Sequence, residues 1–249
     1  MVLCLNNVRT RFACSVFLLT CILIVGSGPS VHAATRAPAK SKTASPQDAP
    51  SIATVLHNVE ARFADVKDIA GIVDLEQFGG DGSAVQAQTT VQATLPNLLR
   101  LSFVKPETFA GTLYVLDRKT NQVMQYSPIT EQVIVSSIDQ ALSERFVPTT
   151  VEQLFSLPSP EDYDLTVFAT ETSGKQKLVG ISAKAKRDPE SPCFHFWIDQ
   201  ATWMVARMHV FDVQGQPLFT IVLRDIKVNQ NLAEAQLKKM PFGAITVYR

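Results

Sequence analysis

The sequence has none of the motifs that carry the common catalytic chemistries. It contains no G-x-S-x-G nucleophile turn, no H-E-x-x-H zinc-binding helix and no glycine-rich phosphate loop. Its carboxylates are scattered along the chain, and His57, His195 and His209 are isolated from one another in the sequence. General acid and base catalysis needs groups that can act together. The sequence therefore predicts that the protein is not an enzyme.

Cysteine is scarce, and long runs of one charge are missing. Cys4, Cys14 and Cys21 lie near the N-terminus, which leaves Cys193 as the last of four cysteines. No internal disulfide and no Cys/His metal site is predicted beyond that N-terminal region, and we expect no cofactor. The chain has 23 basic and 23 acidic residues, and no Lys/Arg run is dense enough to follow a phosphate backbone. We therefore expect no nucleic-acid partner.

The first 33 residues have the pattern of a secretory signal. Arg9 and Arg11 precede an apolar run over residues 12–25, and small residues end the segment at Ala33. The run is too short for a membrane span, so we expect cleavage after Ala33 and export. An alternative interpretation takes Cys21 as a lipid-modified cysteine that anchors the protein to a membrane.

The remaining chain divides into a linker and one domain. Residues 34–50 are rich in Ala, Pro, Ser, Thr and Lys and show no apolar periodicity. Such a composition cannot offset chain entropy by burial, so we predict a disordered linker. Residues 51–249 are enough for a single domain with its own core.

The domain is predicted to open with a helix and to continue as strands. Ser51 is a candidate N-cap, and apolar residues recur at three- and four-residue spacing from Ile52 to Phe63. From Asp68 onward the apolar period is two, and turn signals separate the short runs, which predicts antiparallel strands. Short helical turns are expected between residues 137 and 157. This order predicts a mainly β, α+β fold in which each strand neighbours the one before it.

Four motifs in this order carry a resemblance to a known family. They are Pro96-Asn97-Leu98-Leu99-Arg100, the hairpin from Tyr114 to Pro128, the turn from Asp212 to Gln216, and the closing stretch from Pro241 to Val247. In order and spacing they resemble the LolA-like proteins, the periplasmic carriers of outer-membrane lipoproteins. The resemblance extends over nearly all of the predicted domain.

The resemblance implies an incomplete, strongly curved antiparallel β-barrel with a helical lid. It implies a monomeric periplasmic carrier that binds acyl chains of lipoproteins or lipids in an apolar cavity and shuttles them between membranes. The implied partners are an inner-membrane release complex and an outer-membrane acceptor. Two alternatives with the same fold stay open: a membrane-anchored lipid or lipoprotein acceptor, and a periplasmic regulator of envelope stress.

Strand parity within the implied barrel gives the candidate ligand-contacting residues. Alternate side chains of a strand share a face. The predicted cavity wall comprises Val73, Leu75, Val91, Leu99, Leu101, Phe103, Leu113, Val115, Met124, Phe168, Phe196, Trp203, Phe219 and Ile221. The predicted lid comprises Leu56, Val59, Phe63, Leu142, Phe146, Leu154 and Phe155.

One position departs from the family pattern. Well-studied members place an arginine directly before the Pro-Asn pair, where it ties the lid to the barrel, and this chain has Leu95 there. Leucine has no hydrogen-bonding group on its side chain, so this polar latch is expected to be missing. Opening and closing of the lid would then depend on apolar contacts.

Overall fold

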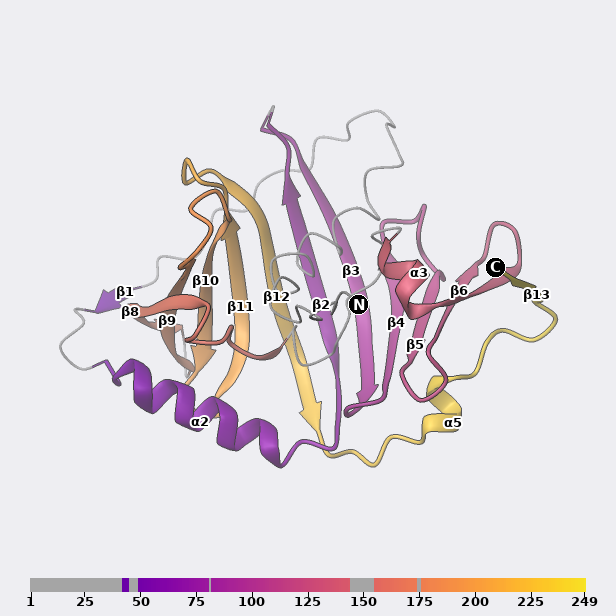
Figure 1. Ribbon diagram of the computed structural model, residues 1–249, viewed down its shortest axis with the longest axis horizontal. Coiled ribbons are helices and arrows are strands. Elements are labelled where there is room, and N and C mark those ends of the chain that lie inside the picture. The colour runs from indigo at the N-terminus through magenta and orange to yellow at the C-terminus, as the bar shows by residue number, and fades with distance from the viewer. Residues whose placement is uncertain (1–41, 45–48, 81, 144–154, 174–175) are drawn as a thin grey trace, which may run out of the picture.

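A single curved sheet makes up most of the molecule (Figure 1). The computed structural model describes residues 42–44, 49–80, 82–143, 155–173 and 176–249. The described elements are β1 (Lys42–Ala44), α2 (Ile52–Ala64), β2 (Asp68–Phe78), β3 (Ala84–Thr94), β4 (Leu98–Lys105), β5 (Leu113–Asp117), β6 (Gln122–Ser127), β7 (Gln132–Ser137), α3 (Ile138–Ser143), β8 (Tyr163–Ser173), β9 (Gln176–Ala185), β10 (Cys193–Asp199), β11 (Met204–Phe211), β12 (Pro217–Val228), α5 (Glu234–Leu237) and β13 (Ile245–Tyr248). The predicted mainly β fold is confirmed.

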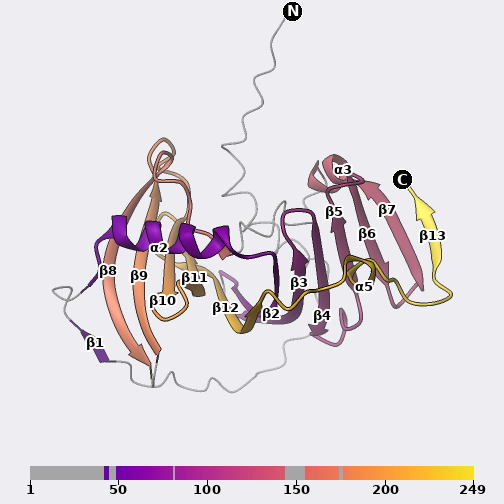
Figure 2. The same ribbon diagram turned by 90° about the horizontal axis from the view of Figure 1, so that it is seen from below.

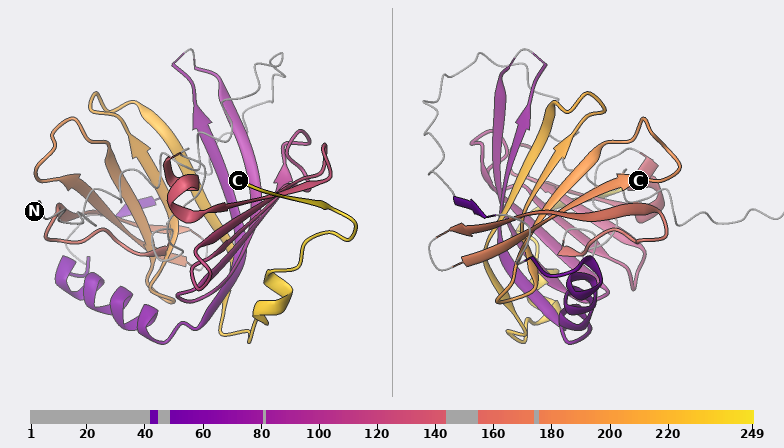
Figure 3. Two further views of the ribbon diagram at one scale, coloured as in Figure 1. Left: turned by 45° about the vertical axis from the view of Figure 1, so that its right-hand side comes forward. Right: turned by 90° about the vertical axis from the view of Figure 1, so that its left-hand side faces the viewer.

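Two antiparallel meanders are joined side by side in this sheet. The thirteen strands follow the order β1-β8-β9-β10-β11-β12-β2-β3-β4-β5-β6-β7-β13. Within β2–β7 and within β8–β12 each strand neighbours the one before it, as predicted. The prediction was wrong at the junctions, because β12 pairs with β2 and β13 pairs in parallel with β7. The sheet ends at β1 and β13 and does not close, so the predicted incomplete barrel is confirmed (Figure 3).

The short strand β1 was not expected. It lies in the segment predicted to be a disordered linker and pairs antiparallel with β8, placing Lys42 opposite Thr172. It thereby extends the sheet at the edge away from β13.

The predicted opening helix is α2, which runs along the β8–β11 half of the sheet (Figure 2). The Ser51 side chain accepts a hydrogen bond from the Thr54 N–H at 3.1 Å, which caps the helix as predicted. Val55 and Val59 are buried on its apolar stripe. After the helix, the Asn229 side chain accepts from the Lys67 N–H at 2.8 Å. The end of α2 is therefore tied to the end of β12, 162 residues further along the chain.

The two faces of the sheet are both apolar in places, but to different extents. We call the face that carries Leu101 the inner face and the opposite one the outer face. Buried residues from α2 and from both meanders form one continuous cluster on the inner face, called the inner cluster below. A small second cluster on the outer face joins Leu98 and Val115 to Leu237 of α5. Because successive residues of β4 alternate between faces, Leu98 and Leu99 belong to different clusters.

Arg100 holds the segment around α5 against the outer face. Its guanidinium donates to the carbonyl of Leu237 at 2.9 Å and to that of Lys239 at 2.7 Å. The buried Asp117 carboxylate forms an ion pair with Lys238 at 2.5 Å. Burial acts to raise the pKa of Asp117, but the hydrogen bond and charge of Lys238 outweigh it and the pKa is lowered. The arginine of the Pro-Asn strand motif thus fastens the C-terminal segment.

Candidate functional site

Most of the predicted wall residues lie together on the inner face. The following belong to the inner cluster and are each at most 5% exposed: Val73, Leu75, Val91, Leu99, Leu101, Phe103, Phe196, Phe219 and Ile221. Trp203 packs against the same cluster from the turn before β11. These side chains pack against one another as a core.

Three predicted wall residues in the first meander lie on the outer face instead. In the β4–β5 pairing Leu101 is opposite Tyr114, so Tyr114 faces inward, whereas Leu113 and Val115 face outward. Val115 belongs to the outer cluster, and Met124, its partner on β6, packs against that cluster. Every residue of β5 is buried, because the α5 segment covers its outer side. The apolar character of the β5 residues alone therefore does not show which of them face inward.

Phe168 also lies away from the inner cluster. β8 carries a bulge at this position, which changes the alternation of its side chains. The ring is 37% exposed and lies against His195, with 4.5 Å between ring centroids, and against Trp197 at 5.3 Å. Gly180 lies beneath it, where a Cβ would come within 2.8 Å of the Phe168 ring. The prediction that Phe168 lines the inner face was wrong.

The predicted lid residues that the structure describes contact the inner cluster in part. Val59 and Phe155 are buried members of it, Phe63 packs against it, and Leu56 is half-buried on α2. Phe146 and Leu154 lie outside the described residues, and so does the side chain of Leu142. Leu95, which stands where the family has an arginine, also packs against the inner cluster. Its contact is apolar, as its chemistry requires.

A gap opens in the sheet where β11 and β12 separate. Their pairing runs from the Phe211 end to Arg207 opposite Val222 and stops there among the described residues. Beyond that point β11 stays with β10 and β12 stays with β2. We call this gap the seam, formed by residues 204–206 of β11 and 223–228 of β12. A register shift between Arg224 and Lys227 marks where β12 turns away.

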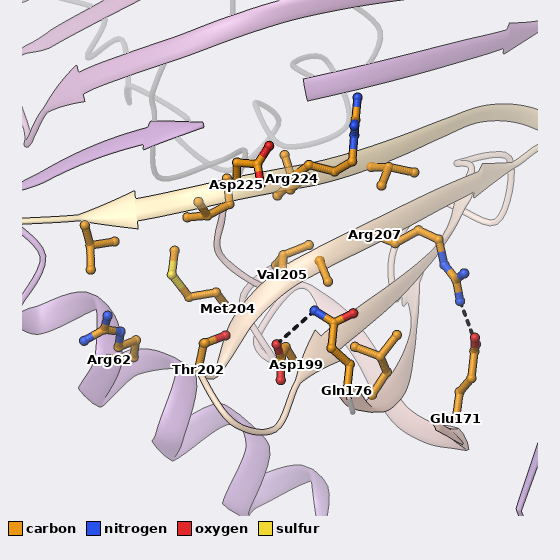
Figure 4. A pocket seen from close by; sticks show the side chains of 16 residues that line it. Arg62, Glu171, Gln176, Asp199, Thr202, Met204, Val205, Arg207, Arg224 and Asp225 are labelled. Atoms are coloured by element: carbon orange, nitrogen blue, oxygen red, sulfur yellow. Dashed lines mark hydrogen bonds and ion pairs between the residues drawn. The ribbon is translucent and has the colours of Figure 1, made fainter. Parts of the chain in front are cut away.

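A pocket of about 580 Å³ occupies the seam (Figure 4). Its lining residues come from α2, β8, β9, β10, the β10–β11 turn, β11 and β12. Met204, Val205 and Leu223 line it and also belong to the inner cluster, so the pocket reaches the apolar core. None of the predicted wall residues lines this seam pocket. A second, smaller hollow of about 210 Å³ lies along β2, β3 and β12 and includes Leu75 among mostly polar neighbours.

Three arginines line the rim of the seam pocket, and they differ in whether a carboxylate pairs with them. Arg207 forms an ion pair with Glu171 at 2.7 Å. Arg224 is bonded to Asp74, which raises the pKa of Arg224. Arg62, from α2, has no ion pair or hydrogen bond in the part of the chain that the structure describes, and its Nε is buried. A buried donor without a partner costs about 1–3 kcal/mol.

Two acidic residues complete the polar rim. Asp199 is buried and accepts from the Ala201 N–H at 2.9 Å and from Gln176 at 3.4 Å. Asp225 is exposed at the bend of β12. The described residues contain no group of three or more His, Cys, Asp or Glu side chains that could hold a metal ion.

Sequence reasoning missed the residues of the seam pocket, although some signals were present. Arg62 lies three residues after Val59 on α2, so its side chain is next to the apolar stripe of the helix. Met204, Val205 and Leu223 are apolar strand residues like many others in the sequence. Nothing in their local pattern shows that β11 and β12 separate beside them.

Several solved structures match this chain over about three quarters of its length. An uncharacterized conserved protein from Thermus thermophilus matches with a TM-score of 0.54 and 19% identity, over 79% of this chain and 98% of that one. A LolA superfamily protein from Nitrosomonas europaea matches with a TM-score of 0.38 and 12% identity, over 77% and 99% of the two chains. The Mycobacterium tuberculosis lipoprotein LppX matches with a TM-score of 0.44 and 12% identity, over 74% and 99%.

These likenesses concern the fold and carry no statement of function. A LolA superfamily protein and a domain named for outer-membrane lipoprotein sorting are thus among the solved structures that match this chain. No protein-family model matches the chain, and no curated protein sequence matches it. Among the described residues, no helix is both long and apolar enough to cross a bilayer.

Proposed function

We propose that this protein binds the acyl chain of a lipid or lipoprotein in the seam pocket and carries it through the cell envelope. The observation that carries this proposal is the pocket of about 580 Å³ whose floor is formed by Met204, Val205 and Leu223 of the inner cluster. Pockets that enclose small ligands measure roughly 300–1,000 Å³. An apolar floor beneath a polar rim suits a molecule with a hydrocarbon tail and a polar head.

The energetics of acyl transfer explain why such a pocket is needed. Moving a sixteen-carbon chain into water costs on the order of 12 kcal/mol, at about 0.8 kcal/mol per CH₂. A carrier must keep the chain covered and must later release it. The seam supports release, because in the described structure the facing segments of β11 and β12 share no ladder hydrogen bonds that would have to break when they move apart.

The proposed location is the periplasm, on the basis of the N-terminal signal pattern. We expect a soluble monomer that starts after Ala33, takes its cargo from an inner-membrane release complex and passes it to an outer-membrane acceptor, without enzymatic activity. The mass of the mature N-terminus separates this carrier from an anchored acceptor. A start at Ala34 supports the carrier, and a diacylated Cys21 supports the acceptor.

Native mass spectrometry of the protein purified from its own periplasm tests the proposal. We expect an adduct with the mass of a lipid, which solvent extraction identifies as an acyl-containing molecule. A clean mass without adduct under gentle conditions, together with no uptake of a sixteen-carbon fatty acid, would contradict the proposal.

Filling the pocket tests whether the seam is the binding site. Ala206 lines the pocket, and Ala206→Phe adds a ring where the acyl chain is expected to lie. We expect binding of a fluorescent sixteen-carbon fatty acid to weaken about tenfold or more, or about 1.4 kcal/mol or more. Ala84→Phe on β3, at an exposed position away from the seam, is the matched control. Equal binding by both variants, with similar thermal unfolding, would exclude the seam as the site.

A further inference from the structure

Arg62 is the one arginine of the seam pocket that has no carboxylate partner among the described residues. The other two arginines of the rim are each occupied by a carboxylate of this chain, Arg207 by Glu171 and Arg224 by Asp74. Arg62 contacts no acceptor within the described structure, and its Nε is shielded from solvent. Figure 4 places Arg62 on α2, at the end of the pocket nearest Met204. The helix thus brings a cation to the edge of the apolar floor.

No acidic residue of the rim forms an ion pair with Arg62 in the described part of the chain. Asp199 uses its carboxylate to accept from the Ala201 N–H and from Gln176. Asp225 is exposed, and no ion pair joins it to Arg62. Burying the Arg62 Nε–H donor without an acceptor is unfavourable. An oxyanion beside Arg62 would accept a charge-assisted hydrogen bond and so remove this cost. The planar guanidinium matches the paired oxygens of a carboxylate or phosphate.

We propose that Arg62 binds the anionic headgroup of the amphiphile whose acyl chain occupies the seam pocket. This inference depends on the proposed function and names its ligand class: an acyl chain that ends in a carboxylate or phosphate oxyanion. The chain lies against Met204, Val205 and Leu223, and the oxyanion accepts hydrogen bonds from the Arg62 guanidinium. Headgroup recognition therefore comes from α2, and tail recognition comes from the sheet.

Three probes with the same sixteen-carbon chain test the headgroup. Palmitate supplies a carboxylate, 1-palmitoyl lysophosphatidic acid supplies a phosphate, and 1-monopalmitoylglycerol is uncharged. Each probe is added to the full mature protein at concentrations below the critical micelle concentration of that probe. Its affinity is measured by displacement of a bound fluorescent fatty acid. We expect at least one anionic probe to bind about tenfold more tightly than the uncharged probe. The stronger of the two anions identifies the preferred headgroup.

Substitution of Arg62 tests its role, and Lys67 supplies the control. In Arg62→Gln we expect the preference for the anionic probe to fall to about twofold while the uncharged probe binds as before. Arg62→Lys keeps the charge without the planar fork, and we expect an intermediate preference. Lys67→Gln removes the same charge from an exposed site five residues away and should keep the full preference. Thermal unfolding of each variant shows that the fold is retained.

The outcomes separate this inference from the proposed function. If the wild-type protein binds none of the three probes, the proposed function fails. If it binds all three equally, the acyl site stands and the anionic headgroup is refuted. If the preference survives in Arg62→Gln, or disappears equally in Lys67→Gln, Arg62 is not the recognising group.

Discussion

His209 is expected to make the protein less stable in mildly acidic solution. It lies on β11, facing outward, with its Nδ1 3.1 Å from the Thr220 hydroxyl oxygen. Burial, with the nearby charges of Arg207 and His195 and against an opposing effect of Glu171, lowers the pKa of His209 from 6.5 to about 4. The folded protein therefore keeps this ring neutral down to about pH 4.

The sign and size of the effect follow from proton linkage. In the unfolded chain a histidine has a pKa of about 6.5, so between about pH 6.5 and pH 4 the unfolded state binds a proton that the folded state does not. Stability therefore falls as the pH drops through this range. For the pKa of about 4 in the folded state, the free energy of unfolding should decrease by about 2 kcal/mol between about pH 7.5 and pH 5. Because the ring is only partly buried, solvent screening reduces this to about 1–2 kcal/mol.

Replacing His209 by asparagine isolates this contribution. Asn keeps a polar group near Thr220 but does not titrate in this range. Urea unfolding, followed by the fluorescence of the two tryptophans, gives the free energy of unfolding at both pH values. We expect the loss at about pH 5 to be about 1–2 kcal/mol smaller in His209→Asn than in the wild-type protein. His195 retains a loss of the same sign, because burial and then Lys184 lower its pKa as well.

A second histidine, His57, supplies the control for this experiment. His57→Asn, at an exposed position on α2, is the matched control for the substitution. If His209→Asn loses as much stability on acidification as the wild-type protein, the ring is not held neutral by the fold.

Two further substitutions test the packing on each face of the sheet. Arg100→Gln removes the charged hydrogen bonds to the carbonyls of Leu237 and Lys239, and should lower the free energy of unfolding by about 2 kcal/mol. Hydrogen exchange should speed up in the α5 segment but not in α2, and unchanged exchange around α5 would show that this contact does not hold it. Phe155→Ala removes a ring that is 0% exposed in the inner cluster, and urea unfolding should show a loss of about 3–5 kcal/mol. A loss below about 1 kcal/mol would mean that the ring is not part of the core.

The features predicted correctly are those that depend on neighbouring residues. The Ser51 cap and the apolar stripe of α2 are set within one or two helical turns. The hairpins of the second meander follow from turn residues between period-two runs, such as the turn that ends at Gln216. Local backbone preferences and side-chain periodicity are enough to predict such elements from the sequence.

The errors share one cause, which is contact between distant residues. Leu113 and Val115 were placed on the wrong face because α5, more than a hundred positions away, buries the outer side of β5. Phe168 was misplaced by a bulge that β8 makes against β9. A strand that is covered on both faces has apolar residues at successive positions. The alternation of polar and apolar residues that would show which side chains face inward is then missing.

The amino-acid sequence alone determined the mainly β architecture, the capped helix and the absence of known catalytic motifs, because these depend on local propensity and residue type. Only the tertiary structure decided where a ligand could enter. β12 leaves β11 to follow β2, a strand almost 150 residues earlier, and this choice of partner opens the seam. Arg62, Met204 and Leu223, from three separate elements, line the pocket in this seam. Strand pairing is selected by the packing of the whole inner face, so no single segment contains the information that creates the pocket.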